Sequence, residues 1–252
     1  MEKILTIIIP TYNNPKELTA TLESILELID FFDLLIIDSS DNYPLDFKFK
    51  NELGKFSKWV KPNGVYDAIN RGIELTNTRY LMTLNSGDTV ISSSLIKILE
   101  NYLNVLCTSD LLVGCQNVSY RGIIYKYSPS FNSLWPHQSV IYKKELHDKI
   151  GLFNTNYKII SDQLFFEKIK IEERLNIKFI EEAITTYDVT GMSSIMNSRN
   201  LNEYKVLNTI RRKTNLKLYL RYGFYQLCKF LNIDFNIVWH SIKMILIPKS
   251  NR

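Results

Sequence analysis

Three aspartates stand at or near the ends of expected secondary-structure elements, where carboxylates can do chemistry. Asp38 ends the apolar segment "LLIID", Asp88 follows the segment "YLMTL" in the turn "NSGD", and Asp162 opens an expected helix in "ISDQLFFEKI". A carboxylate at such a place can accept a hydrogen bond from a nucleoside, hold a hard divalent cation, or act as a general base. Each aspartate also has a plainer interpretation, as a turn residue or a helix cap.

The segments around Asp38 and Asp88 alternate between short apolar strands and amphipathic helices. The run "ILTIII" is β-branched and stops at Pro10, which is typical of a strand buried on both faces. The next helix is expected to start with Asn14 as N-cap, Pro15 at its first position and Glu17 in a capping-box-like place. Residues 34–38, 64–75, 80–84 and 92–103 continue the pattern as strand, helix, strand and helix. This order predicts an α/β fold with a parallel sheet.

Ligands of such sheets bind at the carboxyl ends of the strands. The residues expected there are polar in all three cases: 10–13, 38–41 and 85–88. Pro10, Thr11, Tyr12 and Asn13 could line a base pocket, and Asp38 could accept from a pyrimidine N3–H or a ribose hydroxyl. Asp88 could hold Mg²⁺ or Mn²⁺, which would neutralise a diphosphate as a Lewis acid.

The hydrophobic pattern changes after residue 110. A hairpin is expected with its turn at Arg121-Gly122, followed by a strand and short helix in "PHQSVIYKKELHDKIGLF", a helix from residue 161 and a strand over 177–189. The last fifty residues are predicted to be helical over 199–213, 215–232 and 234–247. We therefore expect one domain over 1–198, with halves 1–110 and 111–198, and a helical tail over 199–252.

Composition excludes several classes of protein. Three cysteines give no disulfide framework, and three widely spaced histidines give no zinc motif. The first apolar run is too short for a signal peptide, and no stretch has the roughly 18 apolar residues of a spanning helix. These features predict a cytoplasmic or peripheral protein with reduced thiols.

The positive charge lies in the tail. Residues 211–252 contain nine Lys or Arg and one acidic residue, whereas the rest of the chain has more acidic than basic residues. A basic, aromatic-rich helix can lie in a membrane interface or pack on the domain with a solvated face. We expect membrane association, and no nucleic acid partner because no nucleic-acid motif is present.

The segments "TIIIPTYNN", "LLIIDSSD", "NGVYDAINRGIELTNTRYLMTLNSGD", "HQSVIYKKEL" and "IISDQLFFEKI" together resemble glycosyltransferase family 2 over about residues 3–195. The block "GVYDAINRGI…TRYLMTLNSGD" is the most specific and is similar to the bacterial polysaccharide-assembly branch. The resemblance implies the GT-A fold, a nucleotide-binding half joined to an acceptor half in one mixed sheet. It also implies inversion at the anomeric carbon.

The resemblance also implies residue roles. The base and ribose would meet Thr11, Tyr12, Asn13, Asp38 and Ser40, beside Pro10. The donor sugar and diphosphate would meet Asp67, Asn70, Arg71, Asn85 and Ser86, with Asp88 as the ligand of Mn²⁺ or Mg²⁺. Asp162 falls at the family's catalytic base, and we expect its helix dipole to keep it ionised. The acceptor side would involve Trp135, His137, Tyr187 and Asp188.

The sequence departs from the family's pattern in two places. Asn85 and Gly87 stand where the metal motif usually has carboxylates, and the region around Tyr187 and Asp188 lacks the histidine that many relatives have. Metal binding is therefore expected to depend on the nucleotide diphosphate.

The activity expected is transfer of a sugar, hexose or N-acetylhexosamine, from a nucleotide donor such as a UDP-sugar to a hydroxyl. The acceptor would be a glycan or a polyprenyl-linked sugar in bacterial capsule, O-antigen or exopolysaccharide synthesis, on the inner face of the cytoplasmic membrane. Two alternatives stay open. One is a sugar nucleotidyltransferase, although "PTYNNPKEL" has no glycine-rich phosphate loop. The other is an inactive, membrane-associated family member. Self-association of the chain also stays open.

Overall fold

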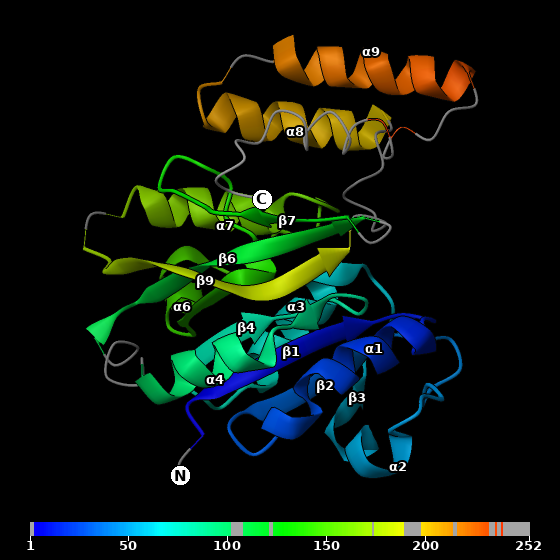
Figure 1. The fold of residues 1–252 in the computed structure, drawn as a ribbon, viewed down its shortest axis with the longest axis vertical. Helices are drawn as coiled ribbons and strands as arrows, with labels where there is room; N and C mark the ends of the chain where they lie inside the picture. Colours follow the sequence, from blue (N-terminus) through cyan, green and yellow to red (C-terminus); the bar gives the residue numbers. More distant parts are fainter. Residues whose placement is uncertain are drawn as a thin grey trace.

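The computed structural model describes residues 3–101, 108–120, 123–172, 174–188, 198–213 and 216–231, together with residues 235 and 238. In this part of the chain, nine strands form one mixed sheet in the order β3-β2-β1-β4-β8-β6-β9-β5, with β7 paired to β6 (Figure 1). Helices cover both faces of the sheet. The expected α/β class and mixed sheet are confirmed.

The first half of the sheet is parallel. β1 (Leu5–Thr11) lies between β2 (Asp33–Asp38) and β4 (Tyr80–Thr83), and β3 (Ser57–Trp59) adds to the outer side of β2. Every residue of β1 is buried, as its unbroken β-branched run predicts. The sequence did not reveal β3, because three residues carry no readable alternation.

The second half joins the first through antiparallel pairing of β8 (Val140–Lys143) with β4. The hairpin strands β6 (Leu111–Tyr120) and β7 (Ile123–Tyr127) follow the expected pattern, while the turn at residues 121–122 lies outside the described residues. β9 (Ile177–Asp188) lies beside β6. The two-residue strand β5 (Thr89–Val90) pairs with β9 and brings the turn at 85–88 against the end of that strand.

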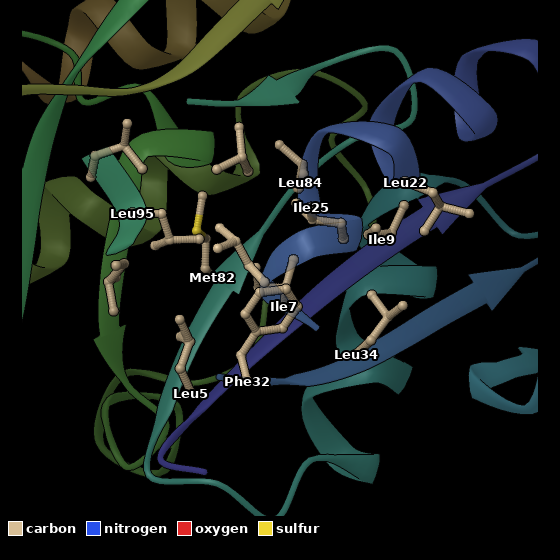
Figure 2. Close-up of a cluster of buried hydrophobic side chains, with 14 of the residues drawn as sticks. Leu5, Ile7, Ile9, Leu22, Ile25, Phe32, Leu34, Met82, Leu84 and Leu95 are labelled. Atoms are coloured by element: carbon tan, nitrogen blue, oxygen red, sulfur yellow. The ribbon is translucent and has the colours of Figure 1, made fainter. Parts of the chain in front are cut away.

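Two apolar cores lie on opposite faces of the sheet. α1 (Pro15–Ile25), the 3-10 turn η1 (Leu26–Leu28) and α4 (Ser92–Asn101) cover one face, and Ile7 and Ile9 of β1 point into that core (Figure 2). α3 (Val65–Leu75), α6 (Leu146–Ile150) and α7 (Ser161–Lys170) cover the other face, into which Ile8 points. The alternation of neighbouring residues between two cores is the period of a buried strand. Two short elements, α2 (Lys50–Leu53) and η2 (Gly54–Phe56), connect β2 to β3.

The start of α1 differs from the expected capping box. Asn14 is the N-cap, but its side chain makes no cap hydrogen bond. Its Oδ1 atom instead accepts hydrogen bonds from the Thr11 hydroxyl at 2.5 Å and the Tyr12 backbone N–H at 3.3 Å. The side chain therefore ties down the loop after β1, where it serves the ligand-binding edge of the sheet.

Two helices of the tail lie side by side: α8 (Ser198–Ile210) and α9 (Leu216–Phe230) (Figure 1). α8 is anchored to the domain because Glu203 accepts the backbone N–H groups of Lys158 and Ile159. Arg211 at its end forms an ion pair with Glu167 at 3.1 Å. The third expected helix, over 234–247, lies almost wholly outside the described residues. Among the residues described, no helix combines the length and apolar character needed to cross a membrane.

Candidate active site

The loops that follow β1 and β2 are joined at the carboxyl edge of the parallel sheet. The Asn13 side-chain amide donates to Asp41 at 2.7 Å, and the Asp41 backbone N–H donates back to Asn13 Oδ1 at 3.1 Å. The Asn13 backbone N–H donates to Ser40 Oγ. Asn13 adopts a left-handed conformation with φ of 53°, which asparagine tolerates better than most residues. These bonds hold the two loops in one fixed arrangement.

Exposed aromatic and carboxylate groups lie on this pair of loops. The Tyr12 side chain is 53% exposed, and its hydroxyl lies 3.3 Å from Asp41 Oδ2. Trp59, at the end of β3, is 49% exposed and donates its ring N–H to the Ser40 carbonyl. Flat apolar rings beside a carboxylate suit a nucleoside base and its N–H groups.

Other predicted nucleotide residues shape this edge from within. Pro10, Thr11 and Ser40 are buried. The Pro10 carbonyl accepts a hydrogen bond from the Ser86 hydroxyl at 3.1 Å, and this contact joins the loops after β1 and β4. These buried residues therefore help to fix the loops at this edge of the sheet.

Asp38 has a structural role that the sequence did not indicate. The residue is 1% exposed, and its two carboxylate oxygens accept the backbone N–H groups of Ser40 and Leu45 at 2.9 and 3.0 Å. The carboxylate thus holds the loop after β2 closed from beneath. Asp41 presents an exposed carboxylate in the same loop, and contact of Asp38 with the nucleotide stays a prediction.

Asp88 occupies a buried corner beside the end of β9. Its Oδ2 atom accepts a hydrogen bond from the Gln138 side-chain amide at 2.9 Å. The turn that carries Asp88 is fixed by Thr21 of α1, whose hydroxyl donates to the Asp88 carbonyl and accepts from the Gly87 N–H. Gly87 has φ of 103°, a left-handed conformation that favours glycine.

The donor set at this corner fits a hard cation in part. Asn85 Oδ1 is buried and has no hydrogen-bond partner among the described residues, which is costly unless something satisfies that oxygen. Asp88 and Asn85 would offer one charged and one neutral oxygen. No group of three or more His, Cys, Asp or Glu residues in the described part of the chain could hold a metal. The remaining ligands would have to be water and substrate oxygens, as is common for Mg²⁺ and Mn²⁺.

The predicted residues of α3 divide between the site and the core. Asn70 was expected on the open face, but it is buried, and its amide exchanges hydrogen bonds with the backbone of Phe153 at 2.8 and 3.0 Å. That expectation is wrong, because the amide is used to hold the segment before α7. Asp67 is half-buried, and Arg71 is exposed and forms an ion pair with Glu74 at 2.8 Å.

Asp162 lies in the first turn of α7 and receives three side-chain hydrogen bonds. The Tyr66 hydroxyl donates to Oδ1 at 2.7 Å, while His137 Nδ1 and Gln163 Nε2 approach Oδ2 at 3.2 and 3.0 Å. Burial raises the pKa of this carboxyl, but the bonds from His137, Tyr66 and Gln163 outweigh it and lower the pKa below its usual value. Asp162 is therefore ionised, as expected, and these side chains are the cause.

The predicted acceptor-side residues lie in different environments. Trp135 was expected to stack on a sugar, but it is fully buried against Phe166 and Phe179, with Lys170 over its ring, so that expectation is wrong. His137 contacts Asp162 directly. Tyr187 lies next to the strand end that faces β5, and the Asp188 side chain lies outside the described part of the chain.

Sequence reasoning missed Tyr66, Gln138 and Trp59. Tyr66 and Gln138 stand inside the segments "GVYDAIN" and "HQSVIY", which were singled out for other residues. Both are buried, and their importance depends on which carboxylate each one meets. Trp59 could not be assigned to the site because the strand that it ends, β3, was not recognised in the sequence.

Comparisons with known proteins identify the family and the fold of this chain. The model of the family described as "Glycosyl transferase family 2" matches residues 6–165. Proteins named "PGL/p-HBAD biosynthesis glycosyltransferase" from Mycobacterium bovis and Mycobacterium tuberculosis are 26% identical over 201 residues, which is 75% of this chain and 78% of theirs.

Solved structures of TarS from S. aureus share the fold. A structure of TarS 1-349 superposes with a TM-score of 0.62 and 20% identity over 83% of this chain, and this chain covers 64% of that one. The same protein in complex with UDP-GlcNAc gives a TM-score of 0.64 at 19% identity, with 83% of this chain and 66% of that chain covered. These are structures of a GT-A glycosyltransferase, and the likeness confirms that fold here. With the family match covering well over half of its length, the chain belongs to glycosyl transferase family 2.

Proposed function

We propose that this glycosyltransferase moves a sugar from a UDP-sugar to a hydroxyl of a glycan or lipid-linked acceptor, with inversion, in the synthesis of a bacterial surface polysaccharide. The observation that carries the proposal is a pair of buried carboxylates, Asp88 and Asp162. Two adjacent residues hold them: Gln138 donates to Asp88, and His137 contacts Asp162. Three exposed groups, Tyr12, Asp41 and Trp59, lie on the joined loops at the same edge and suit a nucleoside. The mycobacterial relatives, named for glycolipid synthesis, and the UDP-GlcNAc complex of TarS support the substrate class.

The reaction is a direct displacement at the anomeric carbon. An acceptor hydroxyl attacks that carbon and forms the new C–O bond while the bond to the diphosphate breaks on the opposite face. The proton of the hydroxyl passes to the Asp162 carboxylate, and the electron pair of the broken bond leaves on UDP. A placed general base of this kind contributes on the order of 10²- to 10⁴-fold to the rate. Tyr66 and His137 keep the carboxylate ionised until the proton arrives.

Asp88 and Asn85 would hold Mn²⁺ or Mg²⁺ together with the diphosphate. When bound, the cation stabilises the charge that develops on the leaving diphosphate. Because the described residues offer a single carboxylate there, we expect cation and nucleotide to bind together.

The same proposal places the protein on the inner face of the bacterial cytoplasmic membrane through α9. Leu220, Leu227 and Leu231 are spaced by seven and four residues, so they share one face of that region, and all are more than half exposed. Lys229 and Lys213 are exposed nearby in the chain. An exposed apolar face on a helix that also carries basic residues suits an anionic membrane surface, where a lipid-linked acceptor would be found.

Vesicle flotation tests the membrane contact. The full chain should float with vesicles that contain phosphatidylglycerol, and the double variant Leu220→Gln/Leu227→Gln should lose most of this binding. The control is Ile171→Gln, which removes an exposed apolar side chain between α7 and β9 and should float like the parent. Equal flotation of parent and double variant would show that this face of α9 does not contact the membrane.

The activity is tested with a panel of UDP-sugars. Thermal shift with and without Mn²⁺ selects the donor, and release of UDP from that donor is then followed for Asp162→Asn and Asp88→Ala. Both variants should lose about 10²-fold or more in rate. Asp110→Asn is the matched control, since it removes a carboxylate that pairs with Lys143 at the amino end of the sheet and should leave turnover unchanged. Unchanged turnover in both site variants would refute the assignment.

A further inference from the structure

A single 3-10 turn, η3 (His137–Ser139), touches both carboxylates of the site. His137 Nδ1 lies 3.2 Å from Asp162 Oδ2, and Gln138 Nε2 donates to Asp88 Oδ2 at 2.9 Å. The two aspartates come from different elements, 74 positions apart in the sequence. Two adjacent residues of the turn therefore bridge the part of the site proposed for the base and the part proposed for the diphosphate.

Polar contacts fix this turn to the sheet. Gln138 Oε1 accepts a hydrogen bond from Gln116 of β6 at 3.3 Å, and Gln116 also donates to Thr185 of β9 at 3.2 Å. The Ser139 and Thr185 hydroxyls are 2.6 Å apart. Every member of this network is buried, so each loss would leave a polar group without its partner. Both backbone and side chains of the turn are thus held in one geometry.

The chemistry of Asp162 decides which ring nitrogen of His137 carries a proton. An ionised carboxylate can only accept, so His137 Nδ1 must donate. His137 Nε2 is buried and has no hydrogen-bond partner among the described residues. The ring is therefore committed to Asp162 through one nitrogen.

We propose that η3 is a positioning element for the transfer reaction, in which His137 sets the base carboxylate and Gln138 sets the carboxylate that meets the diphosphate. The inference rests on the proposed function and deepens it, because it assigns roles to two residues that touch the carboxylates rather than the reacting atoms. Direct neighbours of this kind typically change affinity or activity by roughly 10- to 100-fold when their donors are removed.

The two amide side chains distinguish the nitrogens of His137. An asparagine places an N–H near the position of Nδ1, whereas a glutamine places one near Nε2. His137→Asn should therefore keep most of the rate of donor hydrolysis, and His137→Gln should lower kcat roughly 10- to 100-fold with little change in KM. If both variants retain the parent rate, or if both lose it equally, the Nδ1 contact is not the role of His137.

The pH profile gives a readout that a packing role would not move. In the part of the chain that the structure describes, the ionisable groups that face Asp162 are His137 from η3, Tyr66 from α3, Tyr142 from β8 and Tyr204 from α8. The pKa values of the three tyrosines are all raised, so their hydroxyls stay protonated at neutral pH. The His137 hydrogen bond lowers the pKa of Asp162, whereas burial raises it. Without that bond the pKa of Asp162 rises, so the acid limb of kcat should move to higher pH in His137→Gln. An unmoved acid limb would overturn the positioning role.

Gln138 is tested by binding, which needs no acceptor. Gln138→Met keeps the shape of the side chain and removes its donor, so titration calorimetry with UDP and Mn²⁺ should show roughly 10- to 100-fold weaker affinity. His137→Gln, measured in the same way, should bind UDP and Mn²⁺ like the parent. Parent-like affinity of Gln138→Met would overturn the assignment.

These outcomes separate the inference from the proposed function. A parent protein that neither binds UDP nor hydrolyses any UDP-sugar of the panel would refute the function itself. A parent protein that does both, with parent-like Gln138→Met and His137→Gln variants, would keep the function and refute the role of η3.

Discussion

Gly72 allows α3 to lie close against the sheet, and replacing it with alanine tests how the helix that carries Tyr66 is positioned. A Cβ atom at this residue would lie 2.4 Å from Ile8 Cγ2 on β1 and 3.3 Å from Ile37 Cγ1 on β2. Carbon atoms in contact are normally about 3.5–4.0 Å apart. Either α3 must lift from β1 or Ile8 must leave its position in the core.

The expected magnitude combines two opposite effects. Overpacking of a well-packed core costs about 1–3 kcal/mol, while alanine in place of glycine inside a helix gains about 1 kcal/mol. Gly223→Ala is the matched control, because it makes the same change inside α9 at a position with no heavy atom of the described chain within 4 Å. Gly223→Ala should stabilise, Gly72→Ala should destabilise or be neutral, and the difference of about 1–3 kcal/mol isolates the packing effect.

Urea unfolding of the parent and both variants measures this difference. In a chain of this size each kcal/mol corresponds to a change in Tm of about 2–4 °C. Because α3 also carries Tyr66, Gly72→Ala should slow donor hydrolysis at a temperature where the protein is fully folded, and Gly223→Ala should not. If Gly72→Ala stabilises the protein as much as Gly223→Ala does, the close approach of α3 to β1 is refuted.

Two further predictions concern carboxylates and a histidine. Asp38→Asn should lower the free energy of unfolding by about 1–3 kcal/mol, because it weakens two buried hydrogen bonds to a charged acceptor. Asp41→Asn should cost less stability, because the hydrogen bonds of Asp41 with Asn13 and Tyr12 are exposed, and it should weaken UDP binding. Urea unfolding and calorimetry compare the two variants, and equal losses of stability would contradict this division of roles. Burial lowers the pKa of His147 to about 4 from its usual 6.5, so the unfolded chain binds more protons between these values and stability should fall by about 3 kcal/mol as the pH drops from 6.5 to 4. In His147→Gln the free energy of unfolding should depend less on pH between 6.5 and 4. If its slope against pH is the same as in the parent, His147 is not the source of the pH dependence.

Local pattern was enough to predict the strands β1, β2 and β4 of the parallel half and the helices α1 and α3 between them. The unbroken β-branched run at β1 and the apolar stripes of α1 and α3 follow from periods of two and 3.6 residues, which are properties of the chain itself. The short strands β3 and β5 were not predictable in this way. β5 has two residues and exists because β9 gives it a partner, with Thr89 paired to Thr186, 97 positions later.

The candidate site was predictable in its location and less so in its members. Parallel strands place their carboxyl ends together, so the polar residues after β1, β2 and β4 had to meet at one edge. Whether a given side chain faces a ligand or the protein is a different matter. Asp38, Asn70 and Trp135 were expected to face ligand, and each is buried against protein partners. The partners of Asn70 and Trp135 come from other elements, and those of Asp38 come from its own loop.

The sequence by itself determined that this chain has aspartates at the edge of an α/β sheet, because residue type, spacing and hydrophobic period are local quantities. Tertiary structure alone decided how those aspartates are held. The pairs Tyr66–Asp162, His137–Asp162 and Gln138–Asp88 each join different elements, and their hydrogen bonds depend on distances that no local pattern encodes. Burial strengthens the need for these partners, since a carboxylate removed from water must be satisfied by the protein.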